Sequence, residues 1–356
     1  MLKIPDRVLV TGGCGFLGSN ITSSFLKLGA NVLVIDAMFR DGCESNLAWI
    51  KSQSLHPDQF SHAKIDLADG LAVKDVFQHH APFDYICHLG GQVAMTTSLL
   101  NPLRDLQTNV IGTFNILECT RAHSPEALIA YSSTNKVYGD LNDLRYTETD
   151  TRFVLPDHPH GLDESTPLDF ASPYGCSKGS ADQYMRDWYR NYGLKTVVFR
   201  HSSIYGGRQF STVDQGWIGW FCRQALLQQQ ARKNHQNAER FTISGSGKQV
   251  RDVLHAQDLI RLYQSAYHHR ESIAGQIFNI GGGMANSLSL LELFRLLESL
   301  TGQAPLKFDH LAPRQSDQKV FVADVGKAHA MLDWQPQVST QEGIQKMLEW
   351  EASNHQ

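Results

Sequence analysis

The stretch "RVLVTGGCGFLGSNITSSFLKLGANVLVID", residues 7–36, decides the fold. A short apolar run leads into a glycine-rich turn, a helical pattern follows, and a second apolar run ends at Asp36. Gly12, Gly15 and Gly18 stand where the first strand would turn into the helix. Glycines there let the backbone approach a pyrophosphate, which the helix N-terminus attracts. This order predicts a dinucleotide-binding unit rather than an ordinary tight turn.

The same alternation of short apolar runs and helical patterns continues along the chain. Further buried-strand candidates are FDYICHLG (83–90), LIAYSS (128–133), TVVFRHSSIYG (196–206) and IFNIGG (277–282). Helical patterns are DGLAVKDVFQHH (69–80), PLRDLQTNVIGTFNILECTRAH (102–123), SPYGCSKGSADQYMRDWYRNYG (172–193), QGWIGWFCRQALLQQQARKNHQNAE (215–239) and SLLELFRLLESLTG (289–302), the last closed by Gly302. Strands alternating with helices predict an α/β fold, a doubly wound parallel (Rossmann) sheet.

After Gly206 the alternation of strand and helix patterns becomes less regular, which suggests a second structural unit. We expect residues 1–206 to form the sheet domain, with about 253–281 returning to it. Residues 207–252 and 282–356 would form a smaller C-terminal substrate-binding lobe. Residues 141–170 have no clear periodicity and several prolines, so we interpret them as an insertion or a lid-like loop.

Composition excludes several classes of partner. The 356 residues are 42% hydrophobic and 19% charged, and the formal charge is −4, so no global field attracts nucleic acid or an anionic membrane. Six scattered cysteines without a C-x-x-C pair suit a reducing, cytoplasmic location. The sixteen histidines lack metal-ligand spacing, so no metal site is expected. The first apolar run has the length of a strand, so we expect neither a signal peptide nor a membrane span.

Acidic residues at strand ends indicate which dinucleotide would bind. Asp36 follows Gly18 by 18 residues, and a carboxylate there can accept both ribose hydroxyls of NAD while repelling a 2′-phosphate. Arg40 lies close enough to weaken that preference for NAD over NADP. Asp66 is expected to end a third strand, where it would contact adenine or cap a helix.

Two residues of the pattern SPYGCSKG suggest redox chemistry on a hydroxyl group. Tyr174 and Lys178 are spaced i and i+4, so a helix places both side chains on one face. An ammonium nearby favours the phenolate and lowers a tyrosine pKa. A phenolate is a suitable base for a sugar hydroxyl. Thr134, at the end of the preceding strand, would hold the same oxygen, whereas Cys176 is expected to pack rather than to act as an acid.

The chain resembles the extended short-chain dehydrogenases/reductases, in the nucleotide-sugar epimerase and dehydratase group. The motifs that carry this resemblance are TGGCGFLG, HLGGQ, TNVIGT, YSSTNKVYG, SPYGCSK, VVFRHSSIYGGRQ, QVRDVLHAQD, FNIGGG and RQSDQKVFVAD. It implies Thr134, Tyr174 and Lys178 at the reaction centre. It also implies NAD contacts from Gly12, Gly15, Phe16, Leu17, Gly18, Asp36, Arg40, Asp66, Leu67, Leu89, Gln92, Asn109, Tyr174 and Lys178. Gly90 and Gly91 stand where relatives usually carry alanines, a difference that we expect to be harmless.

The residues after Thr134 discriminate between branches of this group. In 4,6-dehydratases an Asp-Glu pair stands there, because loss of water needs a proton donor and a base. Asn135 and Lys136 cannot do that work, so dehydration is disfavoured. The resemblance is greatest to members that invert C2 of a CDP-linked dideoxyhexose through a transient 2-keto sugar. Substrate contacts would then come from Thr134, Asn135, Lys136, Arg208, Gln209, Gln215, Arg251 and Arg314.

Other interpretations remain open. A 4-epimerase acting on a UDP-sugar, or a sugar-nucleotide reductase, would use the same three reaction-centre residues. A non-catalytic NAD-binding regulator is a remote alternative, since it would not need them. Trp217 and Trp220 would line a sugar or base pocket, or belong to the core. The resemblance also implies a homodimer or homotetramer, with helices around 103–121 and 174–192 pairing across the interface.

Overall fold

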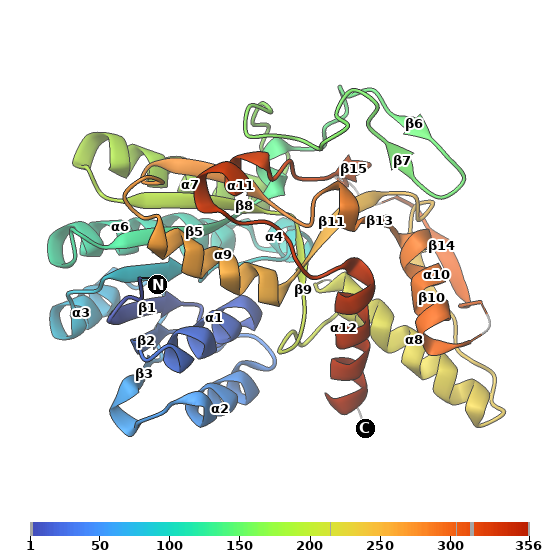
Figure 1. Cartoon of the computed structure of the whole chain (residues 1–356), viewed down its shortest axis with the longest axis horizontal. Coiled ribbons are helices and arrows are strands. Elements are labelled where there is room, and N and C mark those ends of the chain that lie inside the picture. The colour runs from blue at the N-terminus through green and yellow to red at the C-terminus, as the bar shows by residue number, and fades with distance from the viewer. Residues whose placement is uncertain (1–2, 214, 304, 314–316, 355–356) are drawn as a thin grey trace.

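A computed structural model describes residues 3–213, 215–303, 305–313 and 317–354. Its centre is a parallel seven-stranded sheet in the order β12-β8-β5-β4-β1-β2-β3 (Figure 1). The strands are β1 (Arg7–Thr11), β2 (Asn31–Ile35), β3 (Phe60–Ala63), β4 (Tyr85–His88), β5 (Leu128–Thr134), β8 (Thr196–His201) and β12 (Gln276–Ile280). The predicted doubly wound fold is confirmed, because helices cover both faces of this sheet.

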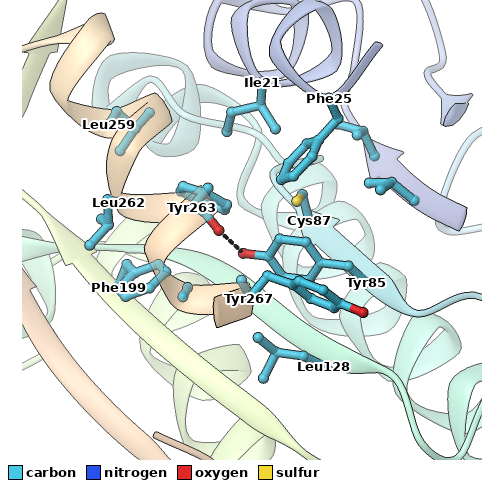
Figure 2. Close-up of a cluster of buried hydrophobic side chains, with 14 of the residues drawn as sticks. Ile21, Phe25, Tyr85, Cys87, Leu128, Phe199, Leu259, Leu262, Tyr263 and Tyr267 are labelled. Carbon is cyan, nitrogen blue, oxygen red and sulfur yellow. Dashed lines mark hydrogen bonds between the residues drawn. The ribbon is translucent and has the colours of Figure 1, made fainter. Parts of the chain in front are cut away.

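Four helices cover the first face: α1 (Phe16–Lys27), α2 (Cys43–Gln53), α9 (Ala256–His268) and α11 (Gly326–Leu332). Their apolar side chains pack with alternate residues of the central strands in one buried cluster (Figure 2). Within it, the Tyr85 hydroxyl donates a hydrogen bond to the Tyr263 carbonyl at 3.0 Å, and Phe25 meets the Tyr85 ring edge-on. Residues more than 170 positions apart in the chain are thereby joined beneath the sheet.

The second face is covered by α3 (Gly70–His80), α6 (Gly112–His123) and α7 (Pro173–Tyr192). Asp69 caps α3 by accepting from two amides, and Ser172 caps α7, whose first position carries the helix-compatible Pro173. Before α6 come the short helices α4 (Met95–Leu100) and α5 (Pro102–Asp105) and a π-helical turn, η2 (Leu106–Ile111). The sequence pattern predicted one helix over 102–123, and the π turn interrupts it.

The C-terminal lobe has its own core. Its main elements are α8 (Trp217–Lys233), β10 (Phe241–Ser244), α10 (Leu290–Thr301), β14 (Phe308–Leu311) and α12 (Thr340–Asn354). Ser289 and Glu292 form a capping box at the start of α10, and Gly302 ends it with a left-handed backbone, as predicted. Strands β10 and β14 pair in parallel beside α8 and α10 (Figure 1).

A small mixed sheet connects the lobe to the main sheet. It contains β9 (Ser203–Tyr205), β11 (Val250–His255), β13 (Ser287–Ser289) and β15 (Val320–Phe321). Short 3-10 turns complete the fold: η1 (Pro57–Gln59), η3 (Asn135–Tyr138) and η4 (Met284–Asn286). β12 returns to the main sheet beside β8, as expected, while the division into two domains stays a prediction.

The segment 141–170, expected to be an insertion or a lid-like loop, is fastened to the body of the protein. It contains a small hairpin of β6 (Thr147–Glu148) and β7 (Phe153–Val154). Arg152 forms an ion pair with Glu292 and also bonds Ser287, while Leu162 is fully buried. None of its described residues lines the main cavity. The sequence suggested a loop because the segment has several prolines and no clear periodicity. The residues that hold it in place lie more than a hundred positions away, so the local pattern does not show them.

No helix among the described residues is long and apolar enough to cross a membrane.

Candidate active site

A cavity of about 740 Å³ lies across the carboxyl ends of the central strands. Crevices at this edge are where ligands bind in doubly wound sheets. Among the predicted site residues, those that line it are Gly12, Gly15, Phe16, Leu17, Gly18, Asp36, Arg40, Asp66, Leu67, Leu89, Gln92, Thr134, Asn135, Lys136, Tyr174, Lys178, Gln209, Gln215 and Arg251. The structure does not bring Asn109 or Arg208 to its wall, and Arg314 lies outside the described residues.

The glycine turn leaves no room for side chains. Gly12 has a φ of +67°, and a Cβ there would lie 2.7 Å from the Gly90 Cα. A Cβ on Gly18 would collide with the Gly12 carbonyl oxygen. The start of α1 therefore faces the cavity as bare backbone, the arrangement that suits a pyrophosphate.

Asp36 is held in place at the far side of this turn. Its carboxylate accepts hydrogen bonds from the Cys14 amide at 2.9 Å and the Met38 amide at 2.8 Å. A carboxylate has about four acceptor positions, so it can still accept two ribose hydroxyls. Arg40 lines the same part of the cavity. The donor set and the bare turn together fit an adenine dinucleotide.

Asp66 does not take one of its two predicted roles, the helix cap. The third strand ends at Ala63, because the next residues leave the sheet, so Asp66 follows the strand rather than ending it. The following helix is capped by Asp69, not by Asp66. Asp66 instead accepts a charged hydrogen bond from Arg104 at 2.7 Å while lining the cavity. An adenine contact stays a prediction.

Asn109 acts behind the cavity wall instead of in it. Its side chain accepts from the Gln92 amide at 2.8 Å and donates to the Ser177 hydroxyl at 2.9 Å. It therefore joins the wall loop of Gln92 to α7. An alanine Cβ at Gly91 would lie 2.7 Å from the Asn109 Oδ1, and one at Gly90 would lie 2.5 Å from Leu67. Alanines at these two positions would therefore require both neighbours to move in this chain, and the expectation that the glycines themselves are harmless stays a prediction.

The reaction-centre residues meet in the cavity. Tyr174 and Lys178 project from the first turns of α7, and Thr134 ends β5. Thr134 and Tyr174 share a side-chain hydrogen bond. The Lys178 Nζ donates to the Ser132 carbonyl at 2.5 Å and lies 4.4 Å from the centre of the Tyr131 ring.

The pKa values at this centre differ from the expectation. Burial raises the pKa of Tyr174 to about 12, opposed by its hydrogen bond to Thr134. Burial lowers the pKa of Lys178 to about 7, although Asp182 and Asp105 favour its charge. We expected the ammonium to lower the pKa of the tyrosine, but desolvation outweighs that effect in the protein without ligands.

Two polar residues near this centre were missed by the sequence analysis. His201 is the β8 residue opposite Thr134, lines the cavity, and is 5% exposed. Within the described part of the chain neither of its ring nitrogens has a hydrogen-bond partner. Asp105 is buried and accepts from Ser177 at 3.0 Å. A polar residue at the end of a buried strand was the available signal for His201, whereas nothing local distinguishes Asp105.

Asn135 and Lys136 both line the cavity, but each also reaches toward the lobe. The Asn135 Nδ2 donates to the Gln318 Oε1 at 2.8 Å. The Lys136 Nζ lies 3.9 Å from the Asp317 carboxylate, which also accepts from Arg251 at 2.7 Å. Burial, and after it the neighbouring Arg251, lower the pKa of Lys136 to about 8. Asp317 and Gln318 belong to the RQSDQKVFVAD motif, although the sequence alone did not single them out.

Arg208 lines a small hollow beside the main cavity, and its predicted substrate contact stays a prediction. Its guanidinium donates to the Asn46 side chain at 2.9 Å, at the start of α2. It also lies over the rings of Trp49, Phe210 and Trp350, each within 6 Å. It therefore fastens α2 to α12 instead of entering the cavity, because three aromatic faces surround its charge.

Amide and aromatic side chains line the cavity on the side of the lobe. Gln209 and Gln215 line it, and the Oε1 of each is buried without a partner among the described residues. Trp217 lines the cavity, whereas Trp220 packs against Phe221 in the lobe core. Cys176 is exposed and lies outside the cavity, so the expectation that it packs is wrong.

No group of three or more potential metal ligands occurs among residues 3–213, 215–303, 305–313 and 317–354.

Comparison with known proteins gives the family. Residues 9–347 match the family described as GDP-mannose 4,6 dehydratase. The CDP-paratose 2-epimerase of Salmonella typhi is 53% identical over 347 residues, which cover 98% of this chain and 99% of that protein. A putative UDP-glucose 4-epimerase of Methanocaldococcus jannaschii is 29% identical, at 98% and 99% coverage.

A solved structure agrees with this placement. The UDP-glucose 4-epimerase of Thermus thermophilus, in complex with NAD, superposes with a TM-score of 0.77 at 25% identity, covering 98% of this chain and 99% of that one. Its match extends over the sheet and the lobe together. The chain therefore belongs to the GDP-mannose 4,6 dehydratase family, within the nucleotide-sugar epimerase and dehydratase group of the extended short-chain dehydrogenases/reductases.

Proposed function

We propose that this protein is an epimerase that interconverts CDP-paratose and CDP-tyvelose by inverting C2 of the sugar. One observation carries the proposal: the cavity joins the triad Thr134, Tyr174 and Lys178 to an amide and an ammonium, Asn135 and Lys136, where a dehydratase needs carboxyls. The 53% identity to the CDP-paratose 2-epimerase of Salmonella typhi supports the same reaction.

NAD is the cofactor that the site fits. The bare glycine turn would receive the pyrophosphate, and Asp36 would accept the ribose hydroxyls. Bound NAD supplies the reversible oxidation of a carbon that carries a hydroxyl group. Since epimerisation has no net redox change, one dinucleotide can serve every turnover.

The residues of the chain handle the proton and the geometry. Tyr174, as its phenolate, takes the proton from the C2 hydroxyl and returns it after the 2-keto sugar has presented its other face. Thr134 donates a hydrogen bond to the same oxygen, and the Lys178 ammonium favours the phenolate. A dideoxy sugar has fewer hydroxyls, so fewer hydrogen bonds must break when it turns in the cavity.

The lobe would hold the nucleotide. Lys136 and Arg251 are the cations that face the cavity near Asp317, and both suit a diphosphate. Gln209 and Gln215 offer buried amide oxygens that can accept from an amino group such as that of cytosine. Trp217 offers a flat apolar surface on the same wall.

We also propose that two copies of the chain associate through α4 to α7. Large apolar side chains are exposed over this stretch although the helices pack on each other: Leu99, Leu100, Leu103, Leu106, Ile111, Phe114, Tyr184, Tyr189 and Tyr192. Exposed large apolar side chains gathered on neighbouring helices typically mark a protein interface. The expected homodimer or homotetramer implies that a second copy of the chain covers these side chains.

The test is NMR of the product formed from CDP-paratose by the purified protein. Inversion at C2 supports the proposal. Inversion at C4 of a UDP-sugar, with no reaction of CDP-paratose, would replace it with the 4-epimerase. No product from CDP-, UDP- or dTDP-sugars would exclude an epimerase altogether.

A further inference from the structure

A chain of buried polar contacts runs from the lobe to the reaction centre. The Asn135 Nδ2 donates to the Gln318 Oε1 at 2.8 Å. On its other side the Asn135 Oδ1 accepts from the Thr134 hydroxyl in a long contact of 3.4 Å. Thr134 in turn shares a hydrogen bond with Tyr174. Asn135 therefore stands between Gln318 and the pair that would handle the substrate oxygen.

Gln318 is fixed in one orientation. It is fully buried, and its Nε2 donates to the Gly139 carbonyl at 2.7 Å and the Asn135 carbonyl at 3.4 Å. Carbonyls can only accept, so the amide nitrogen must face them and the Oε1 must face Asn135. Only a donor at position 135 completes this arrangement. An aspartate there would put a carboxylate against the Gln318 oxygen, which would cost a buried hydrogen bond.

A second contact lies beside the contact between Asn135 and Gln318, and the two pairs are in antiparallel order along the chain. Asn135 pairs with Gln318, while its neighbour Lys136 faces Asp317, the residue before Gln318. Asp317 also holds Arg251. Two consecutive residues after Thr134 are thus joined to two consecutive residues of the lobe. Gln318 itself does not line the cavity, so it can influence a substrate only through its neighbours, and Asn135 is the neighbour that contacts Thr134.

We propose that Gln318 is a positioning residue for Thr134, and that Asn135 transmits its effect instead of recognising the sugar. The pair fixes the turn Asn135–Tyr138 against the lobe and holds the Thr134 side chain, whose single O–H turns from Asn135 to the reacting oxygen when substrate binds. This inference rests on the proposed function only in taking Thr134 and Tyr174 as the groups that contact the reacting hydroxyl. It gives the amide after Thr134 a positive role that a carboxylate could not fill.

The experiment compares Gln318→Met with a matched control, Gln228→Met. Gln228 is also a buried lobe glutamine that bonds backbone, to the Glu239 and Lys307 carbonyls at 2.8 Å each, and it lies outside the cavity wall. Both changes remove buried hydrogen bonds and should lower the melting temperature. Only Gln318→Met should lower kcat, by about 10- to 100-fold, since small misplacements of a catalytic group have effects of that size. KM and retained NAD should stay near the wild-type values.

A double-mutant cycle with Asn135→Ala separates positioning from direct contact. If the two residues act as a unit, the double variant should lose no more kcat than the more damaging single variant. Their effects on the free energy of unfolding should likewise be less than additive, a measurement that needs no ligand. Multiplying losses in kcat, or an unchanged kcat in Gln318→Met, would overturn the inference.

Gln318→Glu covers the case in which the methionine variant does not fold. The protonated carboxyl can donate to the Gly139 carbonyl, whereas the carboxylate cannot. Its kcat relative to wild type should therefore rise as the pH falls, and a ratio that does not change with pH would argue against the inference. Each ratio is measured with whichever nucleotide sugar the wild type converts. Failure of the proposed substrate is thus distinct from failure of this inference.

Discussion

At the scale of single residues, Tyr174 is the group on which the chemistry depends. Tyr174→Phe removes the proton acceptor and leaves the ring in place. We expect kcat to fall by about 10²- to 10⁴-fold, the range typical of a lost general base. Product NMR and rate measurements would check this, with NAD content and melting temperature near those of the wild type as controls. A variant within a few-fold of wild-type kcat would contradict the role of Tyr174.

Lys136 should make substrate affinity depend on pH. Burial and the neighbouring Arg251 lower its pKa to about 8, so it loses its charge at a pH where an exposed lysine keeps its charge. Its attraction for a diphosphate is present below that pKa and is lost as the pH rises through it. We expect the Kd for CDP, measured by calorimetry, to increase between pH 7 and pH 9. Lys136→Met should bind CDP more weakly at pH 7 and should lose most of this pH dependence.

Residues differ in how far the sequence could predict their place. Tyr174, Lys178 and Thr134 could be found because helix periodicity and strand ends fix where they point. Arg208 could not be placed, because two of its aromatic partners, Trp49 and Trp350, come from distant segments. Gln318 could not be found either, since its partner Asn135 is 183 positions away.

At the scale of elements, the helices α4 to α7 carry the proposed interface. Leu103 is 61% exposed on α5, within the apolar surface. Leu103→Glu would place a charge in a desolvated interface, so we expect self-association to weaken by at least about tenfold. Light scattering coupled to gel filtration would measure the change. A matched substitution outside this surface, Leu55→Glu, should leave the association unchanged, and equal effects of both would contradict the interface.

Element positions were predicted well where the pattern was regular. The glycine turn, the parallel strands and the capped end of α10 follow from local rules. The π turn inside residues 102–123 could not be predicted, because the hydrophobic pattern does not reveal one extra residue in a helical turn. For residues 141–170 the sequence left open an insertion or a lid-like loop. It could not show how the segment is anchored, because the anchoring residues, such as Glu292, are distant in sequence.

At the scale of the whole molecule, buried histidines should make the fold sensitive to acid. Burial lowers the pKa of His88 and of His201 to about 3, and that of His255 to about 4. Between those values and about pH 6.5 the unfolded chain binds these protons and the folded chain does not. Stability is therefore lost as the pH falls below about 6.5, by about 1.4 kcal/mol per pH unit for each histidine.

Buried carboxyls act in the opposite direction. Burial raises the pKa of Asp252 to about 6 and also raises the pKa values of Asp105 and Glu164, so the folded chain binds these protons first and gains stability as the pH falls. The large downward shifts of the three buried histidines, joined by a lowered pKa of His62, leave a net loss. We expect the melting temperature to fall steadily from pH 7 to pH 5 and His201→Phe to reduce the slope. A melting temperature that is flat over this range would contradict the assignment of neutral buried histidines.

The order in which the two sheet faces are covered has a consequence for biosynthesis. The helices of the second face are all complete by Tyr192, whereas the first face needs α9 and α11, the latter ending at Leu332. At about 5–20 residues per second, a ribosome takes roughly 7–28 s to make the chain in between. At the start of that interval the first face of the growing sheet is covered only by α1 and α2, so part of its apolar side is open to water. The nascent chain should therefore need chaperones most in this interval. A ribosome that stalls there would leave an aggregation-prone fragment.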